Sequence, residues 1–280
     1  AYERPEERWF LDVDLLVERP DVDAVCEHLA AAGFAPVAGV APPELYDRHH
    51  FHRIVKNPRG LCLEVHWALT LPRSVYTFDL AALRRDARPV ALGAASMLVP
   101  SARDQILHGV LQSVAGGFAD LRRILDLHRL DAQLADGDHR QLGRRAHEHA
   151  LATGLWLQYR LREVLLEAPM PAAVGDDCRP DPGLERTLER LDLPARCLGS
   201  RRPRDGDFDT LVHWLCTPRG RRLREIAHFV VPDRTGLMPM AWSWDGAPGW
   251  RRALLAAQRV PPTLRLLGWW LAARFRASGS

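Results

Sequence analysis

Two carboxylates stand close together near the start of the sequence. Asp12 and Asp14 lie within a stretch over residues 9–17 that alternates apolar and acidic residues and then runs apolar, which is typical of a buried strand. Because side chains alternate along a strand, both carboxylates project from the same face. They repel each other unless a cation lies between them, and Mg²⁺ prefers such oxygen ligands together with nucleotide phosphates. The pair therefore indicates a divalent-metal site, with a solvated strand end as the alternative.

A third carboxylate, Glu64, belongs to a pattern further along the chain. Residues 50–56 and 61–67 are both strand-like and are separated by four turn-forming residues, which predicts a hairpin. If the second of these strands lies beside the first strand of the chain, Glu64 joins Asp12 and Asp14 on one face. Three carboxylates on adjoining strands are what a two-metal phosphoryl-transfer site requires.

Histidines around the same hairpin allow a different site. His49, His50, His52 and His66 could bind zinc together with Glu64, because imidazole and carboxylate groups are suitable zinc ligands. Adjacent histidines on a strand point to opposite faces, so at most two of the first three converge. The other interpretation is that these histidines contact substrate or base, or satisfy polar groups at the edge of the sheet.

The elements that must position these residues change period along the chain. Strand-like patterns and one helix, from Pro20 to Gly33, fill the first part of the sequence, and helical spacing of apolar residues follows beyond Pro72. We therefore predict an α+β protein with a small mixed-sheet domain over residues 1–95 and an all-helical domain over residues 96–280. The features predicted within the helical domain are a helix capped by Ser101, helical segments over 118–134 and 139–166, and a linker near 169–183 rich in proline and glycine.

The composition is that of a globular protein. Of the 280 residues, 47% are hydrophobic and 26% are charged, which excludes disordered and collagen-like chains, and a chain of this length needs no disulfide scaffold to fold. The net charge of +3 favours no particular partner. Among the 38 basic residues Lys56 is the single lysine, so any other phosphate contact must come from arginine, backbone amides or metal.

Several patterns bear on location and partners. The five cysteines are widely spaced and form no Cys-x-x-Cys pair, which predicts free thiols and a cytoplasmic protein. The charged N-terminus is not a signal peptide, and no apolar run is long enough to predict a transmembrane segment. No zinc-finger, helix-turn-helix or RNA-recognition motif predicts a nucleic-acid partner.

Three motifs follow one another along the sequence: Arg8-x-x-x-Asp12-Val-Asp14-Leu-Leu-Val17, His49-His50-x-His52 and Leu63-Glu64-Val-His66-Trp67. In this order they resemble those of the uncharacterised nucleotidyltransferases, a family related to the polymerase-β-like nucleotidyltransferase superfamily. The resemblance extends to about residue 170 and includes helices that carry a histidine and then an aspartate, here His108 and Asp126. It implies that residues 1–95 form a nucleotidyltransferase palm.

This resemblance implies a magnesium-dependent transfer of a nucleoside monophosphate from a nucleoside triphosphate (NTP), such as ATP, to a small-molecule, peptide or protein acceptor. Pyrophosphate is then released. Asp12, Asp14 and Glu64 are the predicted catalytic residues and would hold two Mg²⁺ ions. The predicted substrate-binding residues are Arg8, His49, His50 and His66.

A phosphate-binding turn and helix that are typical of this family are not found in this sequence. The family places a Lys-Gly or Gly-Ser turn and a helix, which help to cradle the triphosphate, before the Asp-x-Asp strand. We expect one of three explanations. Either the turn and the helix were removed, or a second chain supplies them, or the protein no longer transfers nucleotides. Two other functions stay open: a non-catalytic nucleotidyltransferase-fold module that binds a substrate or docks on a partner, and a histidine-site metallohydrolase.

Overall fold

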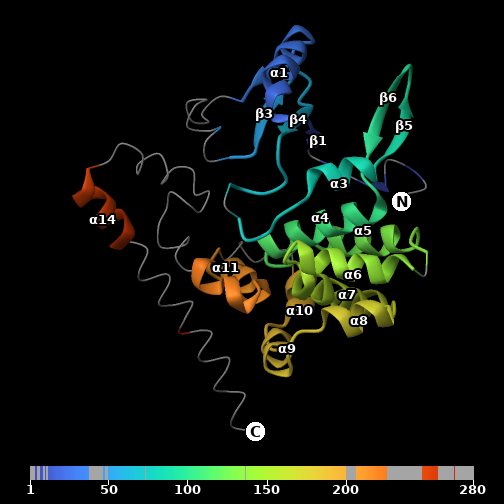
Figure 1. Cartoon of the computed structure of the whole chain (residues 1–280), viewed down its shortest axis with the longest axis vertical. Helices are drawn as coiled ribbons and strands as arrows, with labels where there is room; N and C mark the ends of the chain where they lie inside the picture. The colour runs from blue at the N-terminus through green and yellow to red at the C-terminus, as the bar shows by residue number, and fades with distance from the viewer. Residues whose placement is uncertain are drawn as a thin grey trace. The chain divides into compact units, whose positions relative to one another are not determined.

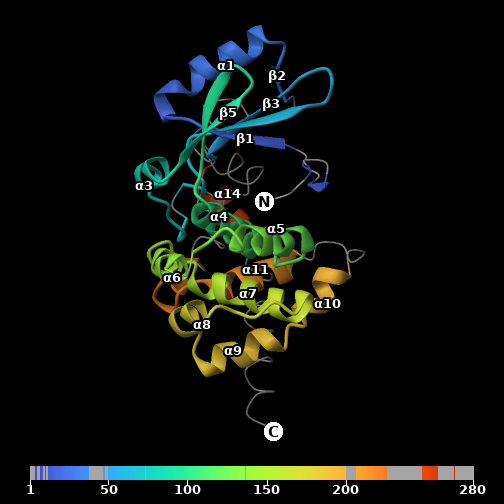
Figure 2. The same cartoon turned by 90° about the vertical axis from the view of Figure 1, so that its right-hand side faces the viewer.

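The fold consists of two compact units, which Figures 1 and 2 show in two views. The computed structural model describes residues 4, 7–8, 10, 12–37, 47, 50–72, 74–135, 137–199, 206–225, 248–257 and 268. One unit comprises Tyr2–Ser74 and Ala227–Arg259, and the other comprises Ala1, Val75–Ile226 and Val260–Ser280. The described elements are β1 (Asp12–Leu16), η2 (Arg19–Asp21), α1 (Val22–Ala31), β2 (Ala35–Pro36), β3 (His52–Lys56), β4 (Cys62–His66), α3 (Leu80–Arg85), β5 (Arg88–Leu92), β6 (Ala95–Val99), α4 (Ala102–Ala115), α5 (Leu121–Asp131), α6 (Asp138–Glu148), α7 (Ala152–Leu166), α8 (Ala172–Cys178), α9 (Pro182–Glu189), α10 (Leu193–Leu198), α11 (Gly206–Cys216), η3 (Arg219–Arg221) and α14 (Gly249–Ala257).

A mixed four-stranded sheet forms the centre of the first unit, with its strands in the order β1-β4-β3-β2. β3 and β4 pair antiparallel, which confirms the predicted hairpin. β1 pairs with β4 in parallel, and Asp14 lies directly opposite Glu64. The α+β fold, with its small mixed sheet followed by helices, is therefore as the sequence predicts.

The two faces of this sheet differ in character. One face carries the buried residues Val55, Leu63 and Val65. The helix α1, which begins at the fully buried Val22, contacts β4. Gly33 follows this helix with a φ of +87°, a conformation that glycine adopts without strain. Because the apolar side chains occupy this face, the alternating positions of the same strands place their polar side chains on the other one.

Helices make up most of the second unit (Figure 2). α4 packs against α5, α7 and α11, and its residues Leu107, Val110 and Val114 are fully buried. Ser101 caps α4 as predicted, because its hydroxyl accepts a hydrogen bond from the backbone N–H of Asp104. Within the described part of the chain, no helix combines the length and the apolar character that crossing a bilayer requires.

Three parts of the second unit differ from the sequence prediction. The helical segment over 139–166 is two helices, α6 and α7, which are interrupted where Ala150 has a φ of +64°. The predicted linker near 169–183 contains a helix, α8. Its prolines do not prevent helix formation, because Pro171 lies at the N-cap of α8 and Pro182 lies at the start of α9, and proline is well tolerated at the start of a helix.

The third difference is a second, two-stranded sheet formed by β5 and β6. Most of its side chains are exposed, so the strands lack the buried apolar face by which the sequence pattern would reveal them. The predicted division at residue 95 falls inside this hairpin, whereas the compact units divide between Ser74 and Val75.

The contact between α4 and α7 gives a test of the helical packing. A Cβ atom at Gly154 would lie 2.7 Å from Cγ2 of Val114 and 3.0 Å from Cγ1 of Val110. Gly154→Ala should therefore lower the free energy of unfolding by about 1–3 kcal/mol, measured in urea, although alanine favours helix. Gly109→Ala is the matched control in α4, where the new Cβ meets nothing within 4 Å, and it should be neutral or stabilising by up to about 1 kcal/mol. Equal stabilities for the two variants would contradict this packing.

Candidate active site

The polar face of the sheet gathers acidic and histidine side chains from three strands. The parallel pairing places Asp12 opposite Cys62 and Asp14 opposite Glu64, so these residues share one face. The antiparallel pairing places His52 of β3 opposite His66 of β4 on that same face. Three residues predicted from the sequence as catalytic, Asp12, Asp14 and Glu64, therefore lie on adjacent strands.

His66 joins the carboxylates of the two neighbouring strands. Its Nε2 atom lies 3.3 Å from Oδ1 of Asp14 and 3.2 Å from Oε2 of Glu64, and its Nδ1 atom donates to the backbone carbonyl of Ala68 at 3.3 Å. Burial opposes the charged form of the ring, but the bonds to Asp14 and Glu64 outweigh it and raise the pKa of His66 to about 9. His66 is therefore an imidazolium at neutral pH, with both ring nitrogens acting as donors.

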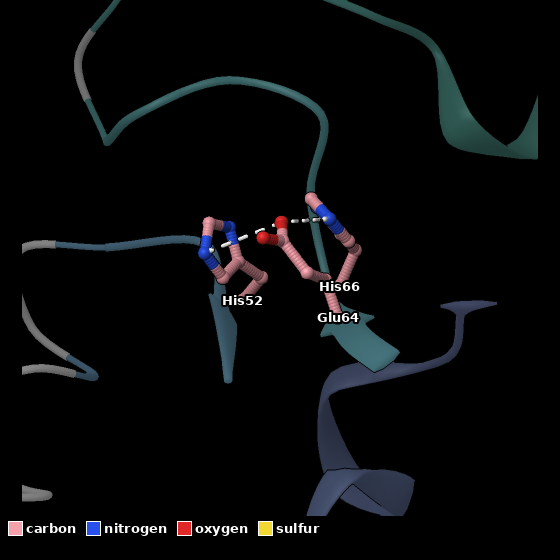
Figure 3. A group of neighbouring side chains, drawn as sticks. All are labelled: His52, Glu64 and His66. Carbon is pink, nitrogen blue, oxygen red and sulfur yellow. Dashed lines mark hydrogen bonds and ion pairs between the residues drawn. The ribbon is translucent and has the colours of Figure 1, made fainter. Parts of the chain in front are cut away.

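Glu64 lies between two imidazole rings. Its Oε2 atom is 3.5 Å from Nε2 of His52, and Figure 3 shows the carboxylate between the rings of His52 and His66. The hydrogen bond from His66 holds the pKa of Glu64 below its usual value, even though burial acts in the opposite direction. Burial lowers the pKa of His52 to about 4, so this ring is neutral at physiological pH.

Asp12 differs from the other two carboxylates in its surroundings. Burial raises its pKa, and the negative charges of Asp14 and Glu64 raise it further. An ionised carboxylate at this position is thus disfavoured by its neighbours, and a cation beside it would relieve the repulsion. The arrangement of three carboxylates is suited chemically to binding divalent metal ions through oxygen.

The other predicted substrate-binding residues have different outcomes. His50 is next to the site, because its ring meets that of His52 edge to face with centroids 4.1 Å apart. Burial lowers the pKa of His50 to about 4. Arg8 is half-buried and lies four residues before β1, whereas His49 is outside the described residues.

Two further residues reach this face through the strand register. His52, for which the sequence allowed zinc binding, a contact to substrate or base, or a role at the edge of the sheet, lies within the cluster. Lys56 is opposite Cys62, which is itself opposite Asp12, so the chain's single lysine is on the same face. The alternation of positions 52, 54 and 56 along the predicted strand was the signal that could have found both.

His108 and Asp126, which the resemblance associates with the family's helices, lie on α4 and α5 in the other unit. Nε2 of His108 is 3.4 Å from Nε2 of Gln112, one turn further along α4. Both side chains are partly buried.

The chain thus has a small mixed sheet that carries three carboxylates on adjacent strands, followed by helices. The family described as uncharacterised nucleotidyltransferase matches residues 1–167, and this chain belongs to it. Neither a curated protein nor a solved structure matches the chain. Membership supports a nucleotidyltransferase-type function in general, and the acceptor and the metal require separate arguments.

The ion pairs of His66 predict how stability depends on pH in metal-free buffer. The pKa of about 9 in the folded protein exceeds the ordinary value of 6.5, so the stabilisation is complete below about pH 6.5 and is lost as the pH rises through 9. The parent should exceed His66→Gln in free energy of unfolding by about 1–3 kcal/mol at pH 6.5, and by much less at pH 10.

Urea unfolding at several pH values, in the presence of a chelator, measures this difference. His28→Gln provides the control, because His28 is an exposed histidine on α1 of the same unit. The comparison separates the effect of His66 within the cluster from the effect of replacing a histidine elsewhere in the unit. A constant difference between His66→Gln and the parent from pH 6.5 to 10 would contradict the ion pairs.

Proposed function

We propose that this protein is a magnesium-dependent enzyme that transfers a nucleoside monophosphate from an NTP to a small-molecule, peptide or protein acceptor. The observation that supports this proposal most directly is the register of β1 and β4, which puts Asp14 opposite Glu64 with Asp12 on the same face. Family membership supports the NTP as the substrate. ATP is the first candidate among the four NTPs.

The donor set fits magnesium. Asp12, Asp14 and Glu64 offer carboxylate oxygens, which are the ligands that Mg²⁺ takes alongside nucleotide phosphates. Burial and then the negative charges of Asp14 and Glu64 raise the pKa of Asp12, and an ion beside it would neutralise that charge. In this proposal the three carboxylates hold two ions. When bound, these ions would polarise the α-phosphate and lower the pKa of the attacking hydroxyl.

The other side chains on this face have supporting roles in the proposal. His66 orients the carboxylates of Asp14 and Glu64 by bonding to both, so that their oxygens stay on the polar face. Lys56 carries the positive charge that would attract the triphosphate, and its position two residues along the strand from Ile54 keeps it on this face. Arg8, His49 and His50 are proposed to contact the substrate.

Two finer parts of the proposal concern the surroundings of the protein. The described cysteines Cys26, Cys62, Cys178, Cys197 and Cys216 are all free thiols, which agrees with the proposed cytoplasmic location. A second chain is one proposed source of a turn that cradles the triphosphate.

The test is a transfer assay with each of the four NTPs, labelled at the α-phosphate, in the presence of Mg²⁺ and a cell extract. Mass spectrometry then identifies whatever molecule gains a nucleotide. Asp12→Asn should reduce transfer by roughly 10²-fold or more, because the site loses a charge that acts on the reacting phosphate. Glu27→Gln is the matched control, since Glu27 is an exposed carboxylate on α1, and it should leave the rate unchanged.

Two outcomes would overturn the proposal. Binding of Mg²⁺ and NTP in calorimetry without transfer to any acceptor would favour a non-catalytic binding module. Equal rates for Asp12→Asn and the parent would remove this residue from the site. Thermal melts in metal-free buffer exclude misfolding as a cause, because Asp12→Asn relieves repulsion and should melt no lower than the parent.

A further inference from the structure

Three side chains on the polar face form a compact group of a different donor type. His52, Glu64 and His66 each offer one ligand atom, and these atoms all lie within 4.8 Å of one another. The side chains are largely withdrawn from solvent, with exposures of 10%, 19% and 6%. Figure 3 shows that they come from two neighbouring strands and point toward one another.

Two distances in this group are also close to those between neighbouring ligands of a zinc site. Nε2 of His66 is 3.2 Å from Oε2 of Glu64, and Nε2 of His52 is 3.5 Å from that same oxygen. Charge-assisted N–H···O bonds are usually shorter, at about 2.7–2.9 Å. In a tetrahedral zinc site with ligands at about 2.0–2.1 Å from the metal, neighbouring ligand atoms are about 3.3–3.4 Å apart. Oδ1 of Asp14, at 3.3 Å from Nε2 of His66, matches that spacing as a fourth ligand.

The outer hydrogen bond of His66 is one that metal-binding histidines usually make. Histidines that bind metal usually donate their other ring N–H to a carbonyl or a carboxylate, which fixes the ring and leaves the ligating nitrogen facing the metal. Nδ1 of His66 donates to the carbonyl of Ala68 and leaves Nε2 facing Glu64. The ring of His50 packs against the edge of His52 and limits its rotation.

We infer that His52, Glu64 and His66 form a binding site for a divalent transition-metal ion, with Zn²⁺ as the preferred occupant. Two imidazoles and one carboxylate are a ligand set found in zinc sites with an open position, and imidazole nitrogens favour zinc over magnesium. The proton on Nε2 of His66 leaves when the metal ion takes its place. This site goes beyond the proposed transfer reaction, with which it shares Glu64.

The sharing of Glu64 has a consequence for the two kinds of ion. Zinc bound to the histidines would take one of the three carboxylates of the proposed magnesium site, and a second one if Asp14 is its fourth ligand. Zinc binding and nucleotide transfer are nevertheless separable by mutation. Asp12 is not in the zinc group, and His52 is not among the three proposed magnesium ligands.

The test is equilibrium dialysis of the full chain against Zn²⁺ alone, with metal analysis and no nucleotide present. The parent should bind one equivalent, which millimolar Mg²⁺ does not displace, and the Co²⁺-loaded protein should show the visible spectrum of a four-coordinate site. His52→Ala should weaken zinc binding by about 100-fold or more. Asp12→Asn and His28→Ala should bind zinc as the parent does, so that the zinc site is judged independently of nucleotide transfer.

Three results would overturn the inference. They are a failure of the parent to bind zinc, displacement of the bound zinc by Mg²⁺, and unchanged zinc affinity in His52→Ala. His52→Gln serves as a second variant if circular dichroism shows that His52→Ala does not fold, and retention of zinc by a folded His52→Gln would likewise contradict the site. Loss of transfer activity in Asp12→Asn with zinc binding intact would support both sites.

Discussion

The parallel pairing of β1 with β4 is the constraint on which the candidate site depends. In this register Asp14 lies opposite Glu64, and a shift of one residue would turn one of the two carboxylates toward the apolar face. Burial of Leu63 and Val65 on that face makes such a shift costly, because a charged group would then replace an apolar one against α1. The hydrophobic core therefore fixes the position of the acidic residues.

Electrostatic compensation explains how the acidic cluster coexists with folding. His66 places one positive charge between Asp14 and Glu64 and holds the pKa of Glu64 low. The pKa of Asp12 is raised by burial and, in addition, by repulsion from Asp14 and Glu64. Such uncompensated charge lowers stability and is typical of positions kept for binding rather than for folding. The same group of side chains thus offers oxygen ligands toward β1 and nitrogen ligands toward β3.

Much of this arrangement was predictable from the sequence. Asp12 and Asp14 are separated by one residue in a strand-like segment, and the four-residue turn between positions 56 and 61 fixes the hairpin that carries Glu64. The position of His52 in the cluster depends on the register between β3 and β4. The alternation of side chains along a strand is compatible with this register but does not determine it. The β5–β6 hairpin was missed because its strands bury little, and α8 was missed because its flanking prolines initiate helices as well as ending them.

Anomalous diffraction tests the central claim most directly, on crystals of the full chain grown with Mn²⁺ in place of Mg²⁺ and with a non-hydrolysable ATP analogue. The account predicts at least one manganese peak about 2 Å from carboxylate oxygens of both Asp12 and Asp14, with the α-phosphate of the analogue bound to the same ion. A nucleotide bound elsewhere, or Asp12 and Glu64 diverging with no metal between them, would contradict the assignment of this face as the active site.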